Sequence, residues 1–304
     1  MTDRIAIDHL ATEGRLPAAR DLDLLRTSEQ VALFAAEDAR AVAAVAAAGD
    51  QIAAAVDLTV ERLRRGGRLI YVGAGTPGRL AVTDAAECRP TFGLPDGRVV
   101  AVMAGGDHAM SRAAERGEDD AAAGHADLDA LAPTGDDVVV GISASGRTPY
   151  VLAALQRAAE AGAATVALVN NTGSPIAGAA DVAIVAETGP EIVSGSTRLK
   201  AGTAQKLVLN TLSTLTMVQL GHTYGDLMVD VQATNDKLVA RAHAIVAAAT
   251  GATGDHVEAA LAAADGAAKV AIVTLLADVD AAEARRRLDA ADGHVRAAVG
   301  DGAA

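Results

Sequence analysis

Residues 68–80, RLIYVGAGTPGRL, join a short apolar run to a glycine-rich loop that opens a helical pattern. The apolar run is continuous and does not alternate with polar residues, which is typical of a strand buried on both faces of a parallel sheet. Similar Val- and Ile-rich runs follow, separated by helical sequence, at residues 98–103, 137–142, 165–169 and 182–185. This alternation predicts an α/β fold with a doubly wound, mostly parallel sheet.

The sequence on both sides of this region is helical in pattern. The N-terminal part is rich in alanine, and the pair Gly66-Gly67 ends its helical pattern just before the first predicted strand. From about Asp236 the chain again has helical periodicity, with glycines that separate short helices. We therefore predict three parts, which are an N-terminal helical segment over residues 1–56, the sheet domain over 57–220 and a C-terminal helical region over 221–304.

The composition argues against several classes of function. Of the 304 residues only 2% are aromatic, none is Trp, and the formal net charge is −13. Nucleic acid is not an expected partner, because bases would find few stacking platforms and phosphates would be repelled. The apolar segments are interrupted by polar side chains and the chain opens without a secretory pattern, so no membrane association is expected. A cytoplasmic protein that binds a small molecule is the remaining class.

Cysteine and histidine give no sign of a disulfide or a metal centre. Cys88 is the only cysteine, which excludes an intrachain disulfide and fits a reducing compartment. The seven histidines lack the spacing of metal ligands. No metal or other cofactor is therefore predicted.

Two glycine- and hydroxyl-rich loops follow the first and third predicted strands. They are residues 73–78, GAGTPG, and residues 143–148, SASGRT. Open parallel sheets bind ligands where loops leave the carboxyl ends of the strands. Each loop also opens a helix, whose free N–H groups favour an anion. The loops thus predict a phosphate site, with these ligand-binding candidates: Gly75, Thr76, Ser143, Ser145, Gly146 and Thr148.

The first loop also matches the fingerprint of dinucleotide-binding proteins. Such proteins need an acidic residue about 20 residues farther on. Here the first candidate is Asp107, which lies 29 residues beyond Gly78. This interpretation also leaves the hydroxyl-rich loop without a function, so we disfavour it.

A third polar segment precedes the long helical pattern that begins near residue 200. The segment 195–210, GSTRLKAGTAQKLVLN, combines hydroxyls and cations. A capped helix start accounts for part of this pattern. We predict that Ser196, Thr197 and Lys200 contribute to the same polar pocket.

These segments, together with DAAECRPTFG (84–93) and YGDLMVDVQATNDKL (224–238), resemble the N-acetylmuramic acid 6-phosphate etherase family. That family has the sugar isomerase (SIS) fold, and the matching blocks span nearly the whole chain. The resemblance implies cleavage of the D-lactyl ether of N-acetylmuramic acid 6-phosphate, without a metal, in the recycling of cell-wall amino sugars. It also implies a homodimer with pockets completed across the interface. One departure is Pro77, where the family usually has serine.

The resemblance further implies two catalytic glutamates. Glu87 matches the proton donor of the family and Glu118 matches its second catalytic glutamate. An ether oxygen is a poor leaving group, so an acid must protonate it while a base removes the hydrogen on C2 of the open-chain sugar. The sequence leaves open which glutamate is the acid. From the residues alone, Glu87 also fits a helix cap or a salt bridge, and Glu118 also fits a solvated charged face.

Two other functions are compatible with a sugar-phosphate pocket on this fold. An aldose–ketose isomerase of phosphosugars would need a base but no acid directed at an ether on C3. A non-catalytic sensor would use the pocket to control a partner, and sensors of this fold often carry a DNA-binding segment. The acidic N-terminus of this chain contains no basic recognition helix.

Overall fold

The structure is a computed structural model of the whole chain. The residues that it describes are 10–112, 117–231 and 236–300. They form two compact units, and each is described here by itself. The first consists of Met1–Ala85 and Gly97–Ser213, and the second consists of Ala86–Asp96 and Thr214–Ala304.

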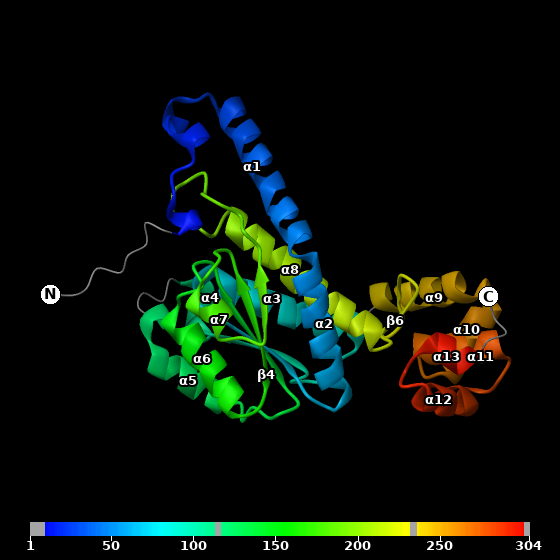
Figure 1. Cartoon of the computed structure of the whole chain (residues 1–304). Helices are drawn as coiled ribbons and strands as arrows, with labels where there is room; N and C mark the ends of the chain where they lie inside the picture. The colour runs from blue at the N-terminus through cyan, green and yellow to red at the C-terminus, as the bar shows by residue number, and fades with distance from the viewer. Residues whose placement is uncertain (1–9, 113–116, 232–235, 301–304) are drawn as a thin grey trace. The chain divides into compact units, whose positions relative to one another are not determined.

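The first unit is built on a five-stranded sheet in which every strand pairing is parallel (Figure 1). The strands are β1 (Leu69–Gly73), β2 (Val99–Met103), β3 (Val138–Ser143), β4 (Ala164–Val169) and β5 (Val182–Val185). Their order in the sheet is β2-β1-β3-β4-β5. All residues of the three central strands are buried, as the continuous apolar runs predicted. The predicted α/β fold is confirmed.

Helices cover both faces of this sheet (Figure 1). On one face α5 (Ala121–Asp129) and α6 (Pro149–Glu160) pack over a buried cluster that includes Ile70, Val139 and Leu155. On the other face α2 (Gly49–Arg64) contacts β3, β4 and β5. The remaining elements that lie wholly or partly in this unit are η1 (Ala11–Glu13), η2 (Pro17–Ala19), η3 (Leu22–Leu24), α1 (Thr27–Ala47), α3 (Gly75–Phe92), α4 (His108–Ser111), η4 (Gly117–Asp119), α7 (Pro175–Gly178) and α8 (Lys200–Gln219).

Helices α3 and α8 run past the boundary between the two units, and a buried polar network joins them to the sheet. Asp84 of α3 is only 6% exposed. Its carboxylate accepts hydrogen bonds from Tyr71 Oη at 2.9 Å, Asn210 Nδ2 at 2.6 Å and Ser213 Oγ at 3.3 Å. A buried carboxylate is costly unless donors surround it, so these bonds fix α3 and α8 relative to β1.

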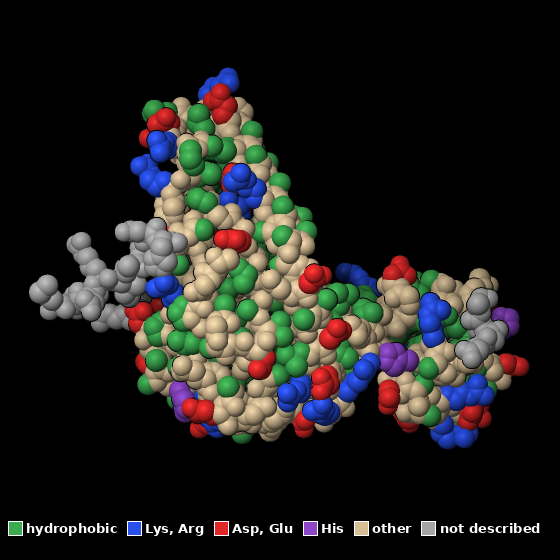
Figure 2. All heavy atoms as spheres, viewed as in Figure 1, with side chains coloured by type: hydrophobic (Ala, Val, Ile, Leu, Met, Phe, Trp, Pro, Cys, Tyr) green, Lys and Arg blue, Asp and Glu red, His purple; other side chains and the backbone are tan. Residues whose placement is uncertain are grey.

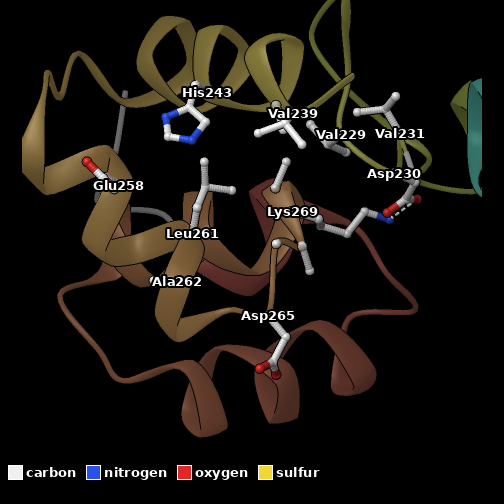
Figure 3. A pocket seen from close by; sticks show the side chains of 14 residues that line it. Val229, Asp230, Val231, Val239, His243, Glu258, Leu261, Ala262, Asp265 and Lys269 are labelled. Carbon is white, nitrogen blue, oxygen red and sulfur yellow. Dashed lines mark hydrogen bonds and ion pairs between the residues drawn. The ribbon is translucent and has the colours of Figure 1, made fainter. Parts of the chain in front are cut away.

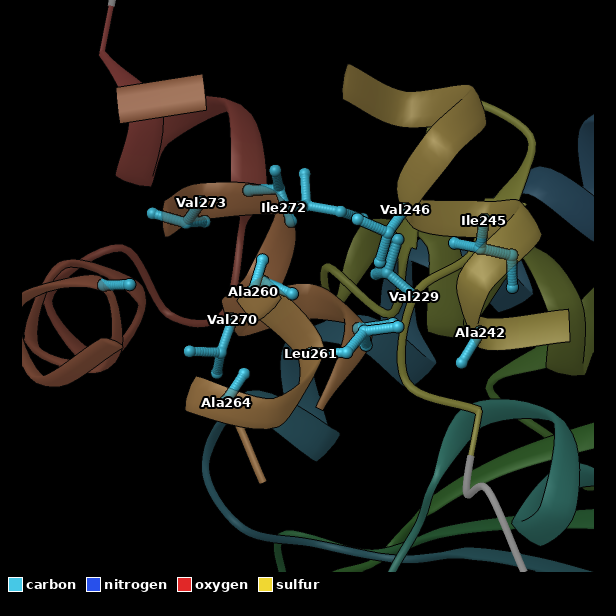
Figure 4. Close-up of a cluster of buried hydrophobic side chains, with 14 of the residues drawn as sticks. Val229, Ala242, Ile245, Val246, Ala260, Leu261, Ala264, Val270, Ile272 and Val273 are labelled. Atoms are coloured by element: carbon cyan, nitrogen blue, oxygen red, sulfur yellow. The ribbon is translucent and has the colours of Figure 1, made fainter. Parts of the chain in front are cut away.

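The second unit is mainly helical, as predicted for the C-terminal region. Its helices are α9 (Asp236–Thr250), α10 (Asp255–Ala263), α11 (Ala268–Ala277), α12 (Ala281–Ala290) and α13 (Val295–Val299). They enclose a core that includes Val246, Leu261 and Ile272 (Figure 4). A short hairpin of β6 (Thr223–Tyr224) and β7 (Leu227–Met228) precedes them and was not predicted.

Within the described residues, no single helix has both the length and the apolar character needed to cross a membrane.

Candidate active site

The order of the strands brings the two predicted loops together. The order reverses between β1 and β3, which makes their carboxyl ends the switch point at which open α/β sheets bind ligands. Gly73 pairs in register with Ile142, so the loop after β1 and the loop after β3 leave the sheet side by side. The sequence predicted both loops, and the topology now gives the reason for their proximity.

The loop after β3 is a compact group of hydroxyls. Ser143 Oγ lies 2.8 Å from Thr148 Oγ1 and 3.5 Å from Ser145 Oγ. It also accepts a hydrogen bond from Gly146 N at 3.0 Å, and Ser145 Oγ accepts one from Arg147 N at 3.3 Å. Helix α6 starts directly after Thr148, with a proline at its first position. Hydroxyls and the free N–H groups of a helix start therefore face the same small region.

Gly146 is required for the shape of this loop. Its φ angle is +68°, which an L side chain rarely adopts, and a Cβ atom there would lie 2.2 Å from Ser174 Oγ. Gly146 O in turn accepts a hydrogen bond from Ile176 N at 3.1 Å. The loop is thus held against the start of α7 by close backbone packing.

The loop after β1 lies next to the segment before α8. Gly75 has a φ angle of +59° and is exposed, and Thr76 follows it in the first turn of α3. A Cβ atom at Gly202 would lie 3.3 Å from Thr76 Cγ2, so the first turn of α8 packs against this loop. Pro77 also lies in the first turn of α3, where an N–H group would have no partner inside the helix.

Ser196 and Thr197 end the segment that leads into α8. Both are half-buried, and within the described part of the chain their hydroxyls make no hydrogen bond. Gly202 N donates to Thr197 O at 3.0 Å, which fixes the backbone beside Thr76. The structure thus places the backbone of Thr197 near Thr76, and the role of the Ser196 and Thr197 hydroxyls in the pocket stays a prediction.

Lys200 has a different position from the one expected of a phosphate ligand. Its side chain is 2% exposed and forms a buried ion pair with Glu37 of α1. Its ammonium group also donates to Pro190 O at 2.8 Å. The predicted binding role does not fit this placement, because the charge is already neutralised and enclosed. Lys200 instead joins α1 to the start of α8.

Glu191 stabilises the same helix start. Its two carboxylate oxygens accept hydrogen bonds from Lys200 N at 3.0 Å and Ala201 N at 2.9 Å. Burial raises the pKa of Glu191, and those two backbone donors offset part of the rise. The carboxylate thus acts as a cap for α8 in the structure.

The two predicted catalytic glutamates lie on different elements. Glu87 is an exposed residue of α3, one turn beyond Asp84. Glu118 is an exposed residue of η4. A Cβ atom at Gly117 would lie 3.5 Å from Ala104 Cβ, which places η4 beside the residue that follows β2. Glu118 therefore lies at the same edge of the sheet as the two loops.

Two residues at this edge were not selected from the sequence. Thr12 near the N-terminus is fully buried, and its hydroxyl accepts a hydrogen bond from Asn171 Nδ2 at 2.9 Å. The same amide group donates to Ala144 O of the hydroxyl-rich loop at 2.9 Å. Asn171 follows β4 closely, and its position after a strand was the signal that could have identified it.

A groove of about 600 Å³ is formed entirely by residues of the second unit (Figure 3). It lies between α9 and the α10–α11 region, and its polar side chains include His243, Glu258 and Lys269. Lys269 and His222 both pair with Asp230. None of the predicted site residues lines this groove, so it adds nothing to the candidate active site.

The chain is similar to known proteins along nearly its whole length. Residues 51–159 match the profile of the glucokinase regulatory protein N-terminal SIS domain, and residues 122–215 match that of the SIS domain. The N-acetylmuramic acid 6-phosphate etherase of Rubrobacter xylanophilus is 56% identical over 296 residues, covering 97% of this chain and 98% of that protein. The etherase of Streptomyces coelicolor is 54% identical, covering 97% of this chain and 95% of that protein.

The chain belongs to the N-acetylmuramic acid 6-phosphate etherase family. The resemblance drawn from the sequence motifs is therefore confirmed, as is the SIS domain. Among solved structures, a phosphoheptose isomerase from Francisella tularensis aligns with a TM-score of 0.49 at 17% identity, over 63% of this chain and 98% of that one.

Proposed function

We propose that this protein cleaves the D-lactyl ether of N-acetylmuramic acid 6-phosphate and releases N-acetylglucosamine 6-phosphate and D-lactate. One observation carries the proposal. A chain 56% identical to an etherase over 97% of its length has a hydroxyl-rich loop at the β1/β3 switch point, where such sheets bind ligands. The enzyme is then a carbon–oxygen lyase that acts in the recycling of cell-wall amino sugars.

The phosphate group is assigned to the loop between β3 and α6. Ser143 Oγ and Thr148 Oγ1 lie 2.8 Å apart, and because hydroxyl hydrogens rotate freely, both groups can donate to phosphate oxygens. Ser145 and Gly146 supply a further hydroxyl and a backbone N–H group, and the start of α6 adds its dipole. The hydroxyls of Ser196 and Thr197, with Gly75 and Thr76, are assigned to the sugar. These assignments combine the geometry of the loops with the match to the family motifs.

The reaction is an elimination followed by addition of water. With the sugar ring open, the C1 aldehyde acidifies the hydrogen on C2, and a carboxylate removes it as a proton. The C3–O bond then breaks, a carboxylic acid protonates the departing lactate oxygen, and an unsaturated aldehyde remains. Water adds its hydroxide at C3 and a proton at C2, so the net change is one water consumed and one lactate released. Each positioned acid or base contributes a factor of about 10²–10⁴ in rate.

We assign Glu87 to protonation of the lactyl oxygen and Glu118 to removal of the C2 proton. Both carboxylates are exposed in the single chain. Opposite protonation states need different environments, which bound substrate or a second subunit would supply. These roles follow the family motifs, and exchange of the C2 hydrogen with solvent separates them.

The test measures D-lactate release from N-acetylmuramic acid 6-phosphate, and the unphosphorylated sugar serves as a control. We expect release to require the phosphate and to fall at least about a hundredfold in Glu87→Gln and in Glu118→Gln. A matched control is Glu160→Gln, because Glu160 is an exposed residue at the end of α6, away from the carboxyl edge of the sheet. No release by a folded protein that binds sugar phosphates would overturn the etherase assignment.

Deuterium exchange in D₂O then distinguishes the two glutamates. If Glu118 is the base, Glu87→Gln still exchanges the C2 hydrogen of the substrate without releasing lactate, whereas Glu118→Gln does neither. The reverse pattern would exchange the two roles. Formation of a ketose phosphate, with no lactate, would identify an isomerase instead.

We also propose that two copies of the chain form a dimer. Side chains along α1 and the turn before it leave large apolar groups in water, with Leu24 79%, Val31 63% and Val42 57% exposed (Figure 2). Apolar surface of this kind is typical of a face covered by a partner. Analytical ultracentrifugation should give twice the chain mass for the wild type and a monomer for the Val31→Asp/Val42→Asp variant. A wild-type monomer at micromolar concentration would contradict the dimer.

A cytoplasmic location goes with this assignment, because a sugar phosphate carries charges that keep it inside the cell.

A further inference from the structure

The N-terminal segment is tied to the hydroxyl-rich loop through one side-chain amide. Asn171 is 2% exposed, and its Nδ2 donates both to Thr12 Oγ1 and to Ala144 O, each at 2.9 Å. Thr12 N donates back to Asn171 Oδ1 at 3.4 Å. Because one amide group bonds to both segments, Thr12 lies within a few ångströms of the loop assigned to the phosphate.

Glu13, the residue after Thr12, is held by the segment that precedes α8. Ser194 Oγ donates to Glu13 O and to Gly14 O, both at 3.2 Å. A Cβ atom at Gly195 would lie 2.9 Å from Glu13 Oε2. The carboxylate of Glu13 therefore lies against Gly195, which directly precedes Ser196 in sequence, while its chain neighbour Thr12 is tied to the hydroxyl-rich loop.

The Glu13 side chain has no partner of its own within the described residues. It is half-buried, and its carboxylate makes no hydrogen bond or ion pair with any of them. Partial burial of a carboxylate without donors is unfavourable, so such a group in a ligand site is ready to accept hydrogen bonds from a ligand. Its backbone, in contrast, is fully fixed, which keeps the cost of ordering it small on binding.

The chemistry of the substrate restricts what this carboxylate can contact. The phosphate and the lactyl carboxylate are both anionic and would be repelled. The hydrogen-bond donors of the amino sugar are its hydroxyls and its acetamide N–H, and these can donate to a carboxylate in strong, charge-assisted bonds.

We propose that Glu13 is a sugar-binding residue that accepts hydrogen bonds from the hydroxyl or acetamide N–H groups of the amino sugar. The proposal rests on the proposed function for the identity of the sugar. Under this proposal Glu13 binds the sugar and the hydroxyl-rich loop binds the phosphate. The N-terminal segment then has a direct role in selecting a phosphorylated amino sugar over other phosphorylated compounds.

Two probes separate these contributions in titration calorimetry, N-acetylglucosamine 6-phosphate and inorganic phosphate. Glu13→Gln should weaken binding of the amino-sugar phosphate by about tenfold to a hundredfold, the usual effect of losing a hydrogen bond to a charged group. Binding of inorganic phosphate should be unchanged. In the lactate assay KM should rise by the same factor while kcat stays within about twofold, as expected when binding is lost equally from substrate and transition state.

The matched control is again Glu160→Gln, which should alter neither affinity. Unchanged binding of the sugar phosphate by Glu13→Gln would overturn the proposal. Parallel loss of sugar-phosphate and inorganic-phosphate binding would also overturn it, because Glu13 would then act by shaping the loop. Lactate release by the wild type tests the proposed function separately. If the wild type binds N-acetylglucosamine 6-phosphate without releasing lactate, the etherase function is overturned and the binding comparison still tests the role of Glu13. If the wild type does not bind this sugar phosphate, both the proposed function and the role of Glu13 are overturned.

Discussion

Replacing Lys200 with methionine separates a structural role from a phosphate-binding one. In the structure the ammonium group pairs with Glu37, and the two side chains are only 2% and 11% exposed. Methionine is an unbranched side chain one atom shorter than lysine, and it leaves the Glu37 carboxylate buried. Among the described residues, the ionic partner that Glu37 then keeps is Arg40, at 3.6 Å and 61% exposed. Removal of one partner from a buried ion pair costs about 3–5 kcal/mol of folding free energy.

Thermal unfolding followed by circular dichroism measures this loss. At about 2–4 °C per kcal/mol for a folding unit of roughly 150–250 residues, the size range of the first unit, Lys200→Met should lower Tm by roughly 6–20 °C. The Glu37→Leu/Lys200→Met double variant removes both charges, and a pair of apolar residues often replaces a buried ion pair at little cost. The double variant should therefore recover most of the lost Tm.

Lys206→Met is the control, because Lys206 is exposed on the same helix and should change neither stability nor binding. The reasoning would be refuted by a Lys200→Met protein that keeps the wild-type Tm but loses affinity for inorganic phosphate. That result would mean that Lys200 is a ligand, as its sequence context predicted, and that its burial against α1 is not important for folding.

Two further predictions concern the hydroxyl-rich loop and the pH dependence of stability. Gly146→Ala places a Cβ atom 2.2 Å from Ser174 Oγ at a φ of +68°, so calorimetry should show inorganic phosphate binding weakened by at least about tenfold. Burial raises the pKa of Asp137, but hydrogen bonds from Arg68 and backbone N–H groups outweigh it and hold that pKa below 3.8. Asp137 therefore stabilises the fold above pH 3.8, and this contribution is lost as pH falls through the lower folded-state pKa. Urea unfolding from pH 7 to pH 2 should show a smaller loss of midpoint below about pH 4 in Asp137→Asn than in the wild type, and equal losses would contradict this assignment.

The parts of the fold that sequence could predict are those that local pattern determines. A strand buried on both faces needs an unbroken apolar run, and a close turn needs glycine, so β1 and its loop are visible within residues 68–80. The order of the strands is not local. The point at which the strand order reverses depends on how all five strands assemble. The pairing of Gly73 with Ile142, which is seen only in the structure, brings the two loops together.

In the candidate site, too, the sequence predicted local groupings but not contacts between distant residues. Ser143, Ser145 and Thr148 lie within six residues, and the Ser143 hydroxyl contacts both of the others in the structure. The sequence context of Lys200 was misleading, because the partner that neutralises it is 163 residues away. A cation next to hydroxyls has the same local pattern whether it binds a ligand or a buried carboxylate.

With Lys200 engaged by Glu37, the groups that we assign to the phosphate are hydroxyls and backbone N–H groups of the hydroxyl-rich loop. Such donors act over short distances and only in a fitted geometry, whereas the net charge of −13 acts over the whole molecule. Under this assignment the protein repels polyanions at long range and still binds a single phosphate in the loop. Discrimination among single phosphates must then come from groups beyond the loop, and Glu13 contributes to it because an anionic carboxylate favours a ligand that presents hydroxyl or amide donors beside its phosphate.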